Sequence, residues 1–424
     1  MYYSRYIEKE IKRKLSTSGA ILVAGPKFCG KTTTCLLFQK SLIKLNNNRT
    51  INIARMNPKQ VLEGERPRLI DEWQTVPDLW NYIKENLDEN YQFGSFIMTG
   101  SSTPADKTNI HHSGAGRITP IKMRTMSLFE SKESSGSVSL KDLFDGDYKE
   151  VYNDNKDFSL NDTAFLICRG GWPISIMNKD REQAIDITRN YYNSLFIFED
   201  SDNEQFRNKR PEILKQVLKS YARNISTEAP IQTILKDVRQ SNERTFDVKT
   251  FNGYVDALRD LFIIEDMEAW NPNIRSKTSI RSTPTRHFVD TSIACRVLNI
   301  MPEDLINDLN TFGLFFEDMA VRDLRIYASA LGGEVRHYRD NAGLECDSII
   351  HLEDGRWAAI EIKLGGEKLI NEGAANLKRL KKKITEKSDE PAPAFMMILT
   401  ATGPLYKRDD DIYVVPINQL QAGI

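Results

Sequence analysis

The first part of the chain, residues 1 to about 150, alternates short β-branched and apolar runs with stretches whose apolar positions recur at helical spacing. That alternation is typical of a parallel sheet whose strands are joined by crossover helices. A helix is expected from Thr33 to Leu45, after the first strand. The predicted strands are Ala20 to Ala24, Thr50 to Ala54, Arg68 to Ile70, Ser95 to Met98 and Ile118 to Met123. We therefore expect an α/β domain over residues 1–202, with a helical lid that begins near residue 150 and breaks at Gly170-Gly171-Trp172-Pro173.

Residues 203–284 change to a mainly helical pattern. Three helices are predicted, Pro211 to Tyr221, Ile231 to Val238 and Val248 to Asp260, the first with proline in its first turn. The run from Leu261 to Ile264 and the stretch to Trp270 are expected to pair as strands. Three helices followed by a β-ribbon predict a winged helix-turn-helix.

Residues 285–424 are expected to form a third domain with the element order α-β-β-β-α-β-β. Its helices are predicted at Leu314 to Leu331 and, lysine-rich, at Glu372 to Glu386. Its strands are predicted at Glu334 to Tyr338, Cys346 to Leu352, Trp357 to Leu364, Phe395 to Thr400 and Ile412 to Ile417. Acidic residues on its first helix and on two of its strands make it a candidate for metal chemistry.

Charge and composition narrow the class of protein without naming a partner. The 424 residues carry 58 Lys and Arg against 59 Asp and Glu, which excludes a polycationic nucleic-acid packer, so any affinity for DNA must come from local patches. The longest apolar runs are strand-length, and neither a signal peptide nor a membrane span is expected. The five cysteines are scattered without the paired spacing of a zinc site or a disulfide framework. These features predict a reduced, cytoplasmic protein.

A phosphate-binding loop is predicted directly after the first strand. The P-loop pattern is met by Gly25, Pro26, Lys27, Phe28, Cys29, Gly30, Lys31 and Thr32, with Thr33 opening the helix. The two glycines let backbone N–H groups face the β-phosphate, and the helix N-terminus adds its dipole. Lys31 would bridge the β- and γ-phosphates, and the Thr32 hydroxyl would hold Mg²⁺. ATP and Mg²⁺ are therefore the expected cofactors, and a glycine-rich turn without nucleotide is the alternative.

Two further strand ends supply polar groups for the same site. Asp71 and Glu72 end the apolar run that begins at Leu69; Asp71 would hold Mg²⁺ through water and Glu72 would orient and deprotonate the attacking water. Two adjacent acids after apolar residues are usually a solvated strand end. The P-loop upstream instead favours a role for both acids in the nucleotide site. Thr99 or Ser101, at the end of the next strand, could sense the γ-phosphate.

Arg117, in a glycine-flanked loop, could reach transition-state charge in its own or in a neighbouring subunit, which would imply a homo-oligomer. The alternative is a surface salt bridge.

With these motifs the sequence resembles prokaryotic AAA-type ATPases that join a P-loop domain to a C-terminal domain of unknown function with a restriction-endonuclease-like, PD-(D/E)XK core. The resemblance covers nearly the whole chain and implies ATP binding and hydrolysis. It implies an α/β fold class: an AAA-type parallel sheet, a winged-helix segment and a nuclease-like C-terminal domain. The residues that carry it are Gly25 to Thr32, Ile70 to Gln74, Val76 to Trp80, Thr99 to Pro104, His112 to Arg117, Met126 to Glu130, Gly170 to Pro173, His337 to Asp340 and Glu361 to Lys363.

A second set of acids and one lysine fits metal-dependent phosphodiester cleavage. Such cleavage needs carboxylates to hold Mg²⁺ and a cation to orient water or stabilise developing charge. Glu317 on the predicted helix, Asp347 on one strand and Glu361 on the next would hold the metal, with Lys363 as the cation. Strand alternation puts Glu361 and Lys363 on the same face. Nuclease-like folds also persist as binding platforms without activity, and that alternative stays open.

DNA is the expected partner of the C-terminal half. The lysine-rich helix carries a basic run that could follow a phosphate backbone, although a solvated helix face explains it equally well. The winged-helix segment from Ser201 to Thr285 holds 14 Lys and Arg against 12 Asp and Glu, a net charge of +2, which is weak for a DNA reader. A connector that passes on the nucleotide state is the alternative. The basic run is Lys378, Arg379, Lys381, Lys382, Lys383 and Lys387.

The leading hypothesis is an ATP-hydrolysing protein whose nucleotide state controls a DNA-directed, nuclease-like C-terminal half. The second hypothesis is a nucleotide-dependent switch whose C-terminal half only binds DNA or a protein partner. Both share the ATP site, and they differ in whether Glu361 and Lys363 do chemistry.

Overall fold

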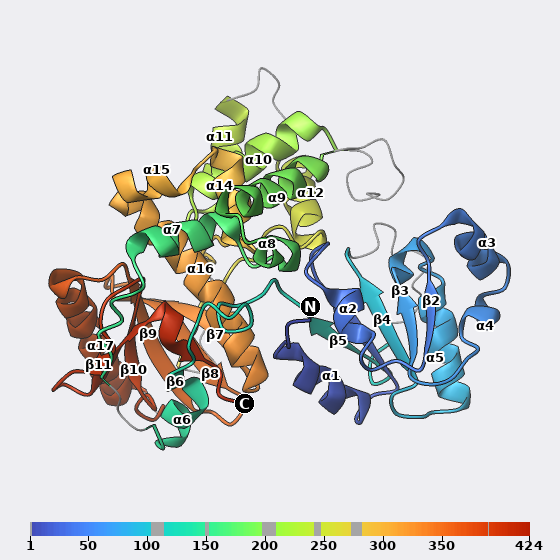
Figure 1. Ribbon diagram of the computed structural model, residues 1–424, viewed down its shortest axis with the longest axis horizontal. Coiled ribbons are helices and arrows are strands. Elements are labelled where there is room, and N and C mark those ends of the chain that lie inside the picture. Colours follow the sequence, from blue (N-terminus) through green and yellow to red (C-terminus); the bar gives the residue numbers. More distant parts are fainter. Residues whose placement is uncertain are drawn as a thin grey trace.

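The computed structural model describes residues 2–102, 114–148, 152–196, 209–240, 247–272, 282–388 and 390–424. Three parts are visible in Figure 1: an N-terminal sheet with its helices, a helical part built from the middle of the chain, and a C-terminal sheet. The long helix α16 (Leu309–Ala330) lies between the helical part and the C-terminal sheet (Figure 1).

The N-terminal sheet has five parallel strands in the order β2-β3-β4-β1-β5. Because all its strands run the same way, their carboxyl ends meet at one edge, with Ala24 beside Gly100 and Asp71 beside Thr99. The strands are β1 (Ala20–Ala24), β2 (Ser41–Lys44), β3 (Arg68–Asp71), β4 (Phe96–Gly100) and β5 (Ile118–Lys122). The helices are α1 (Ile7–Leu15), α2 (Lys31–Cys35), α3 (Asn48–Met56), α4 (Pro58–Val61), the 3₁₀ turn η1 (Trp73–Thr75) and α5 (Leu79–Glu89).

Two predictions for this domain are wrong. The helix expected from Thr33 to Leu45 ends at Cys35, and its second half is strand β2, held by pairing with β3. The strand expected at Thr50 to Ala54 lies inside helix α3. The Asn47 side chain accepts a hydrogen bond from the Thr50 backbone N–H at 3.0 Å, and this N-cap starts the helix despite the β-branched residues that follow. In both places, capping and tertiary pairing override local propensity.

The middle of the chain folds into helices, as predicted. They are α7 (Leu160–Arg169), α8 (Pro173–Met177), α9 (Arg181–Ser194), α10 (Pro211–Arg223), α11 (Ile231–Gln240), α12 (Val248–Asp260), α14 (Thr291–Leu298) and α15 (Pro302–Asn307). The strand pair expected between Leu261 and Trp270 is wrong. Ile264 and Met267 instead form antiparallel bridges with Phe288 and Thr285, so the second arm of the ribbon comes from beyond residue 284.

The C-terminal sheet has six strands in the order β11-β12-β10-β9-β8-β7. The predicted order of elements is confirmed from α16 onward, with the short strands β11 and β13 (Leu420–Gln421) in addition. The predicted domain from residue 285 also contains α14 and α15, which belong to the helical part and were not predicted. β7, β8 and β9 are antiparallel neighbours, whereas β10 lies parallel to both β9 and β12. Helix α17 packs on one face of this sheet and α16 on the other. The elements are β7 (Gly333–Arg339), β8 (Glu345–Leu352), β9 (Trp357–Lys363), α17 (Glu367–Lys387), β10 (Met396–Thr400), β11 (Tyr406–Lys407), β12 (Ile412–Pro416) and the 3₁₀ turn η3 (Ile417–Gln419).

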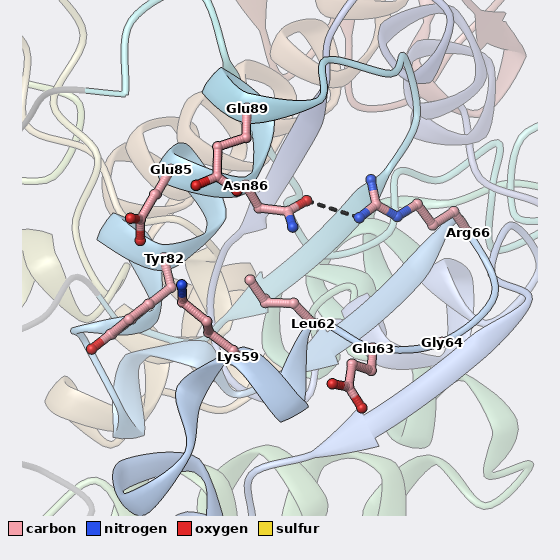
Figure 2. A pocket seen from close by; sticks show the side chains of 9 residues that line it. All are labelled: Lys59, Leu62, Glu63, Gly64, Arg66, Tyr82, Glu85, Asn86 and Glu89. Atoms are coloured by element: carbon pink, nitrogen blue, oxygen red, sulfur yellow. Dashed lines mark hydrogen bonds between the residues drawn. The ribbon is translucent and has the colours of Figure 1, made fainter.

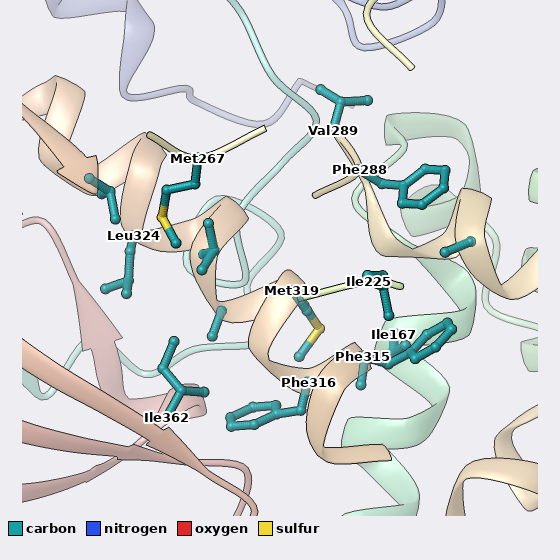
Figure 3. Packing of buried hydrophobic residues seen from close by; sticks show 14 of the residues in the cluster. Ile167, Ile225, Met267, Phe288, Val289, Phe315, Phe316, Met319, Leu324 and Ile362 are labelled. Atoms are coloured by element: carbon teal, nitrogen blue, oxygen red, sulfur yellow. The ribbon is translucent and has the colours of Figure 1, made fainter. Parts of the chain in front are cut away.

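Helix α16 is the centre of the main hydrophobic core (Figure 3). Phe315, Phe316 and Met319 are all fully buried or nearly so, packed with Ile167 of α7 and Ile362 of β9 in one cluster. Truncating a buried side chain of this size to alanine costs about 2–5 kcal/mol. The core therefore joins the helical part to the C-terminal sheet through α16.

The segment after β5 crosses to the C-terminal sheet before the chain enters α7. Strand β6 (Val138–Ser139) pairs in parallel with β13 (Leu420–Gln421), near the end of the chain. In helix α6 (Leu140–Asp145), the Phe144 ring packs at 5.0 Å from that of Phe395. Residues 138–145 therefore pack with the C-terminal domain and not with the N-terminal sheet. None of the helices in the described ranges is long and apolar enough to span a membrane.

Candidate functional site

The P-loop bends tightly against the ends of the two strands beside β1. The Gly25 N–H donates to the Gly100 carbonyl at 3.3 Å, and a Cβ on Gly25 would lie 2.0 Å from the Met123 carbonyl oxygen, so only glycine fits there. Gly30, at φ 100°, occupies the left-handed region as it leads into α2. The loop thereby aims the N-terminus of α2 at the carboxyl edge of the sheet.

The side chains of the predicted loop residues divide between the inside and the outside of the loop. Lys31 is 5% exposed and its Nζ donates to the carbonyls of Gly25 at 2.9 Å and Pro26 at 2.7 Å. Cys29 is fully buried, whereas Phe28 is 61% exposed. Lys27 and Thr33 have partly exposed and exposed side chains, respectively. Lys31 is thus the one cation among these residues whose ammonium lies within the loop.

The hydroxyl and carboxylate predicted to hold Mg²⁺ are in direct contact. Thr32 Oγ1 donates to Asp71 Oδ1 at 2.7 Å, and Thr99 Oγ1 donates to the same oxygen at 2.5 Å. Asp71 is 6% exposed, yet its second oxygen takes no hydrogen bond that the structure describes. Hydroxyl and carboxylate oxygens are the ligands that Mg²⁺ prefers, and with phosphate oxygens and water they would complete its shell. These residues therefore fit the ion.

Glu72 directly precedes the 3₁₀ turn η1, and its backbone lies in the left-handed region, at φ 59°. Its Oε2 accepts hydrogen bonds from Gln74 Nε2 and, at 3.1 Å, from Ser101 Oγ. Thus the two residues predicted to sense the γ-phosphate contact the two acids instead, Thr99 through Asp71 and Ser101 through Glu72. Gln74 has no role in the sequence prediction, although it lies within the motif from Ile70 to Gln74.

Arg117 lies at the opposite edge of the same sheet. It directly precedes β5, whose first residue Ile118 pairs with Ala20 at the amino end of β1, whereas the P-loop follows the carboxyl end. The five residues of β1 span roughly 16 Å. Its Nε is 2.6 Å from Asp88 Oδ1, and its side chain is 43% exposed. Arg117 therefore does not reach the phosphates of its own chain. Residues 103–113, which include part of the motifs quoted around it, lie outside the described ranges.

A cavity of about 380 Å³ opens between residues of α4 and α5 (Figure 2). Arg66 on its rim precedes β3 and donates to the Asn86 side chain at 2.8 Å. The lining is mixed in charge and includes no residue of the predicted ATP site. Its residues are Lys59, Leu62, Glu63, Gly64, Arg66, Tyr82, Glu85, Asn86 and Glu89.

Three of the predicted residues of the C-terminal domain, Asp347, Glu361 and Lys363, are in direct contact. Lys363 Nζ lies 2.8 Å from Asp347 Oδ2 and 2.7 Å from Glu361 Oε2. The side chain of Asn376, on α17, donates to Glu361 Oε1 at 2.7 Å. Burial, and then the charge of Asp347, raise the pKa of Glu317 well above its usual range. Burial and then Asp347 also raise the pKa of Glu361, to about 7.

This arrangement does not fit a metal ion. Among the described residues, no group of three or more His, Cys, Asp or Glu side chains is arranged to hold one. The Lys363 ammonium bridges Asp347 and Glu361, and so supplies the positive charge between them. Burial disfavours a charged lysine, but these two carboxylates outweigh it and raise the pKa of Lys363. The predicted metal ligands Glu317, Asp347 and Glu361 therefore do not form a metal site in this structure.

Ion pairs occupy part of the predicted nucleic-acid surfaces. On α17, Lys378 pairs with Asp410 at 2.9 Å and Lys383 pairs with Asp340. The exposed cations of the run are Lys378, Arg379, Lys381 and Lys382. On α12, Arg259 pairs with Asp256 at 3.2 Å and with Asp266 at 2.8 Å. The side chain of Lys387 lies outside the described set.

A buried polar junction, which the sequence analysis missed, connects the exit of β5 to α16. Asp290 accepts from Thr125 Oγ1 at 2.7 Å, from the Gly171 N–H at 2.9 Å and from Arg322 NH1 at 3.2 Å. Arg322 also pairs with Asp323 at 2.7 Å. These partners are far apart in sequence and follow no motif. The nearest signal is Gly171, in the glycine pair where the predicted lid breaks.

Arg5 ties the P-loop to the same segment. Its guanidinium donates to the Cys29 carbonyl at 2.9 Å, to the Arg124 carbonyl at 2.9 Å and to the Thr125 carbonyl at 3.1 Å. It also lies 3.2 Å from the Glu130 carboxylate. The loop and the junction at Asp290 are thus linked through one side chain and the backbone of Thr125.

Comparison with protein families divides the chain into three matched segments. Residues 17–132 match a family described as an AAA domain. Residues 160–304 match a domain of unknown function, DUF8612, and residues 312–420 match another, DUF4143. The second and third matches support neither a winged helix nor a nuclease core.

Two relatives match over most of the chain. Uncharacterized proteins Mb2031c of Mycobacterium bovis and Rv2008c of Mycobacterium tuberculosis are each 23% identical over 361 residues, covering 83% of this chain and 72% of theirs. Among solved structures, the Walker-type ATPase PABY2304 of Pyrococcus abyssi aligns with 13% identity and a TM-score of 0.44, over 70% of this chain and 96% of that one. A signal transduction ATPase with numerous domains, PH0952 of Pyrococcus horikoshii, aligns with 11% identity and a TM-score of 0.26, over 78% and 53%.

The AAA match covers the parallel sheet and all the predicted P-loop residues. The strand order places β4 between β1 and β3, so Thr99 and Ser101 stand between the loop and the two acids. The N-terminal part of this chain is an α/β, parallel-sheet P-loop domain of the AAA ATPase type.

Proposed function

We propose that the protein binds and hydrolyses ATP with Mg²⁺ at the carboxyl edge of its N-terminal sheet. The observation that carries this proposal is the contact of Thr32 and Thr99 with one oxygen of Asp71, beside the P-loop. An isolated strand end would leave Asp71 solvated, whereas here two hydroxyls orient a nearly buried carboxylate.

Each residue has a distinct task in the proposed reaction. Bound Mg²⁺ would neutralise charge on the β- and γ-phosphates and would be held by Thr32 and Asp71. Lys31 would turn from the carbonyls of Gly25 and Pro26 to the phosphates, which compete as stronger, charged acceptors. Glu72 would accept the proton of the attacking water.

The test is hydrolysis measured against Mg²⁺ concentration. Thr32→Val removes the hydroxyl and keeps the shape, so the Mg²⁺ concentration for half-maximal rate is expected to rise at least 10-fold. Thr119→Val, on β5, is the matched control and keeps the wild-type dependence. A wild-type protein that binds no Mg-ATP would overturn the proposal.

We further propose that the C-terminal half binds DNA non-specifically through α17. The observation that favours it is that Arg379 and Lys381 are exposed on one helix, with no ion pair among the described residues. The α12 surface is less suitable, because Arg259 is already engaged by two aspartates. Lys363 between Asp347 and Glu361 supports a binding platform over a metal-dependent nuclease. Incubation with Mg²⁺ or Mn²⁺, ATP and varied DNA, comparing wild type with Glu361→Ala, separates the two: metal-dependent cleavage lost in the variant would favour the nuclease.

In this proposal the nucleotide state acts on the C-terminal half through α16. Arg5 links the P-loop to Thr125, and Thr125 contacts Asp290, which Arg322 of α16 also binds. A homo-oligomer in which Arg117 serves a neighbouring subunit remains part of the proposal.

A further inference from the structure

The side chain of Gln74 folds back onto Glu72, two residues earlier in the chain. Its Nε2 donates to Glu72 Oε2 and lies 3.3 Å from Ser101 Oγ, which donates to the same carboxylate oxygen. The left-handed backbone at Glu72 and the 3₁₀ turn from Trp73 to Thr75 bring the two side chains together. One oxygen of Glu72 thus receives two donors, and Oε1 receives none that the structure describes.

Two donors on one carboxylate oxygen fix the plane of the carboxylate, so that Oε1 points in one direction. A base that must take a proton from a water molecule needs this fixed orientation.

The side chain of Gln74 keeps this orientation although one of its polar atoms is left without a hydrogen bond. Its Oε1 is buried and has no hydrogen-bond partner. A Cβ on Gly100 would lie 3.1 Å from that oxygen and 2.9 Å from Trp73 Nε1, so the absence of a side chain at Gly100 makes room for η1. Buried acceptors are rarely left unpaired, and those that are call for an explanation. The hydrogen bond that Gln74 gives to Glu72 supplies that explanation.

We propose that Gln74 is a positioning residue that orients the carboxylate of Glu72 for proton abstraction, with Ser101 as the second donor. This rests on the proposed hydrolysis of ATP at the same site. It gives Ser101 a role on the base in place of the γ-phosphate contact expected from the sequence.

Gln74→Met tests the proposal, since it keeps the length of the side chain and removes the donor. We expect kcat to fall about 10- to 100-fold, part of what a general base contributes. The Kd for fluorescent ATP should stay within twofold, so that the loss is confined to kcat. Ser101→Ala should show the same separation, with a lower kcat and an unchanged Kd. Gln60→Met, an exposed glutamine on α4, is the matched control and should change nothing.

A merely structural role predicts different results. Loss of ATP affinity in both variants would overturn the proposal, as would an unchanged kcat. In a Glu72→Gln background, Gln74→Met should lower the residual rate no further, because the two residues act as a unit. Failure of the proposed function looks different: wild type would bind Mg-ATP without turnover, or Glu72→Gln would hydrolyse it at the wild-type rate.

Discussion

The hydroxyl of Thr125 donates a 2.7 Å hydrogen bond to the carboxylate of Asp290, 165 positions further along the chain. Both residues are fully buried, at the point where the chain leaves the N-terminal sheet. This contact is where the P-loop domain, the glycine pair at 170–171 and α16 meet. A change in the P-loop domain that moves Thr125 therefore disturbs a charged network rather than a flexible linker.

Breaking this network should cost stability in proportion to the charge left unpaired. Arg322→Met leaves Asp290 and Asp323 buried without their cation, and we expect the free energy of unfolding to fall by about 3–5 kcal/mol. Thr125→Val removes one of the three donors to Asp290 Oδ2 and should cost about 1–3 kcal/mol. Urea unfolding measures both, with Thr119→Val as the control. Equal costs for the two variants would mean that Asp290 is not held mainly by charge.

Two substitutions should separate nucleotide binding from hydrolysis. Lys31→Ala removes the only cation inside the P-loop among the described residues, and should abolish binding or turnover. Glu72→Gln keeps the shape of the side chain but cannot accept the proton, so it should bind ATP and trap it. Equilibrium binding of labelled ATP and phosphate release give the two readouts. Wild-type hydrolysis by the Lys31→Ala protein would show that the P-loop assignment is wrong.

Arg117 should affect turnover only between subunits. Since its own P-loop lies at the other edge of the sheet, we expect ATPase activity per chain to rise with protein concentration, and Arg117→Ala to lower turnover more than ATP affinity. The pair with Asp88 is exposed to solvent and contributes little stability, so the variant should stay folded. If the ATPase rate per chain does not depend on protein concentration and Arg117→Ala has the wild-type rate, the role of Arg117 is limited to its salt bridge with Asp88.

Glu361 predicts a pH dependence of stability. Its pKa is raised to about 7 in the folded protein, so between about pH 4.5 and 7 the folded state holds a proton that the unfolded state has lost. This residue's contribution is therefore present at low pH and is lost as the pH rises through 7, by up to about 3 kcal/mol. The stability of Glu361→Gln relative to wild type should rise by that amount between pH 4.5 and 8. Urea unfolding at both pH values, with Glu334→Gln as a surface control, checks it; a constant difference would contradict it.

DNA affinity, if it resides on α17, should depend on exposed charge and not on sequence. Replacing Arg379, Lys381 and Lys382 with alanine should weaken binding equally for unrelated DNA sequences and flatten its salt dependence, because phosphate contacts carry no base information. Lys383→Ala is a useful comparison, since this lysine already pairs with Asp340. Fluorescence anisotropy over a range of salt concentrations measures the affinity and its salt dependence for each variant. If the full-length wild-type protein binds no DNA at all, the ligand of the C-terminal half would be a protein partner.

The sequence predicted that Thr32, Asp71 and Thr99 would lie together, because each belongs to a local motif at the end of a strand. Asp71 and Thr99 lie 28 positions apart, but both end strands of one parallel sheet, and register brings them together. The same logic predicted that Asp347 would lie beside Glu361, although not that Lys363 would bridge them.

What the sequence could not predict depends on contacts between distant segments. Arg5 reaches Thr125 across 120 positions, and no pattern around either residue announces it. The second arm of the ribbon, at Thr285 to Phe288, was hidden because residues 261–270 already looked like a complete hairpin. The helix at Asn48–Met56 was mistaken for a strand because a single cap, Asn47, decided between the two.

The pairing of β6 with β13 limits how this protein can be divided or recombined. Residues 138–145 precede the whole helical part in sequence, yet they pack against strands near the end of the chain. An excised fragment such as residues 203–424 would leave Leu420 and Phe395 without their partners. These crossing residues lie between the first two matched segments, 17–132 and 160–304. An exchange of the C-terminal segment between relatives would therefore have to carry residues 138–145 with it.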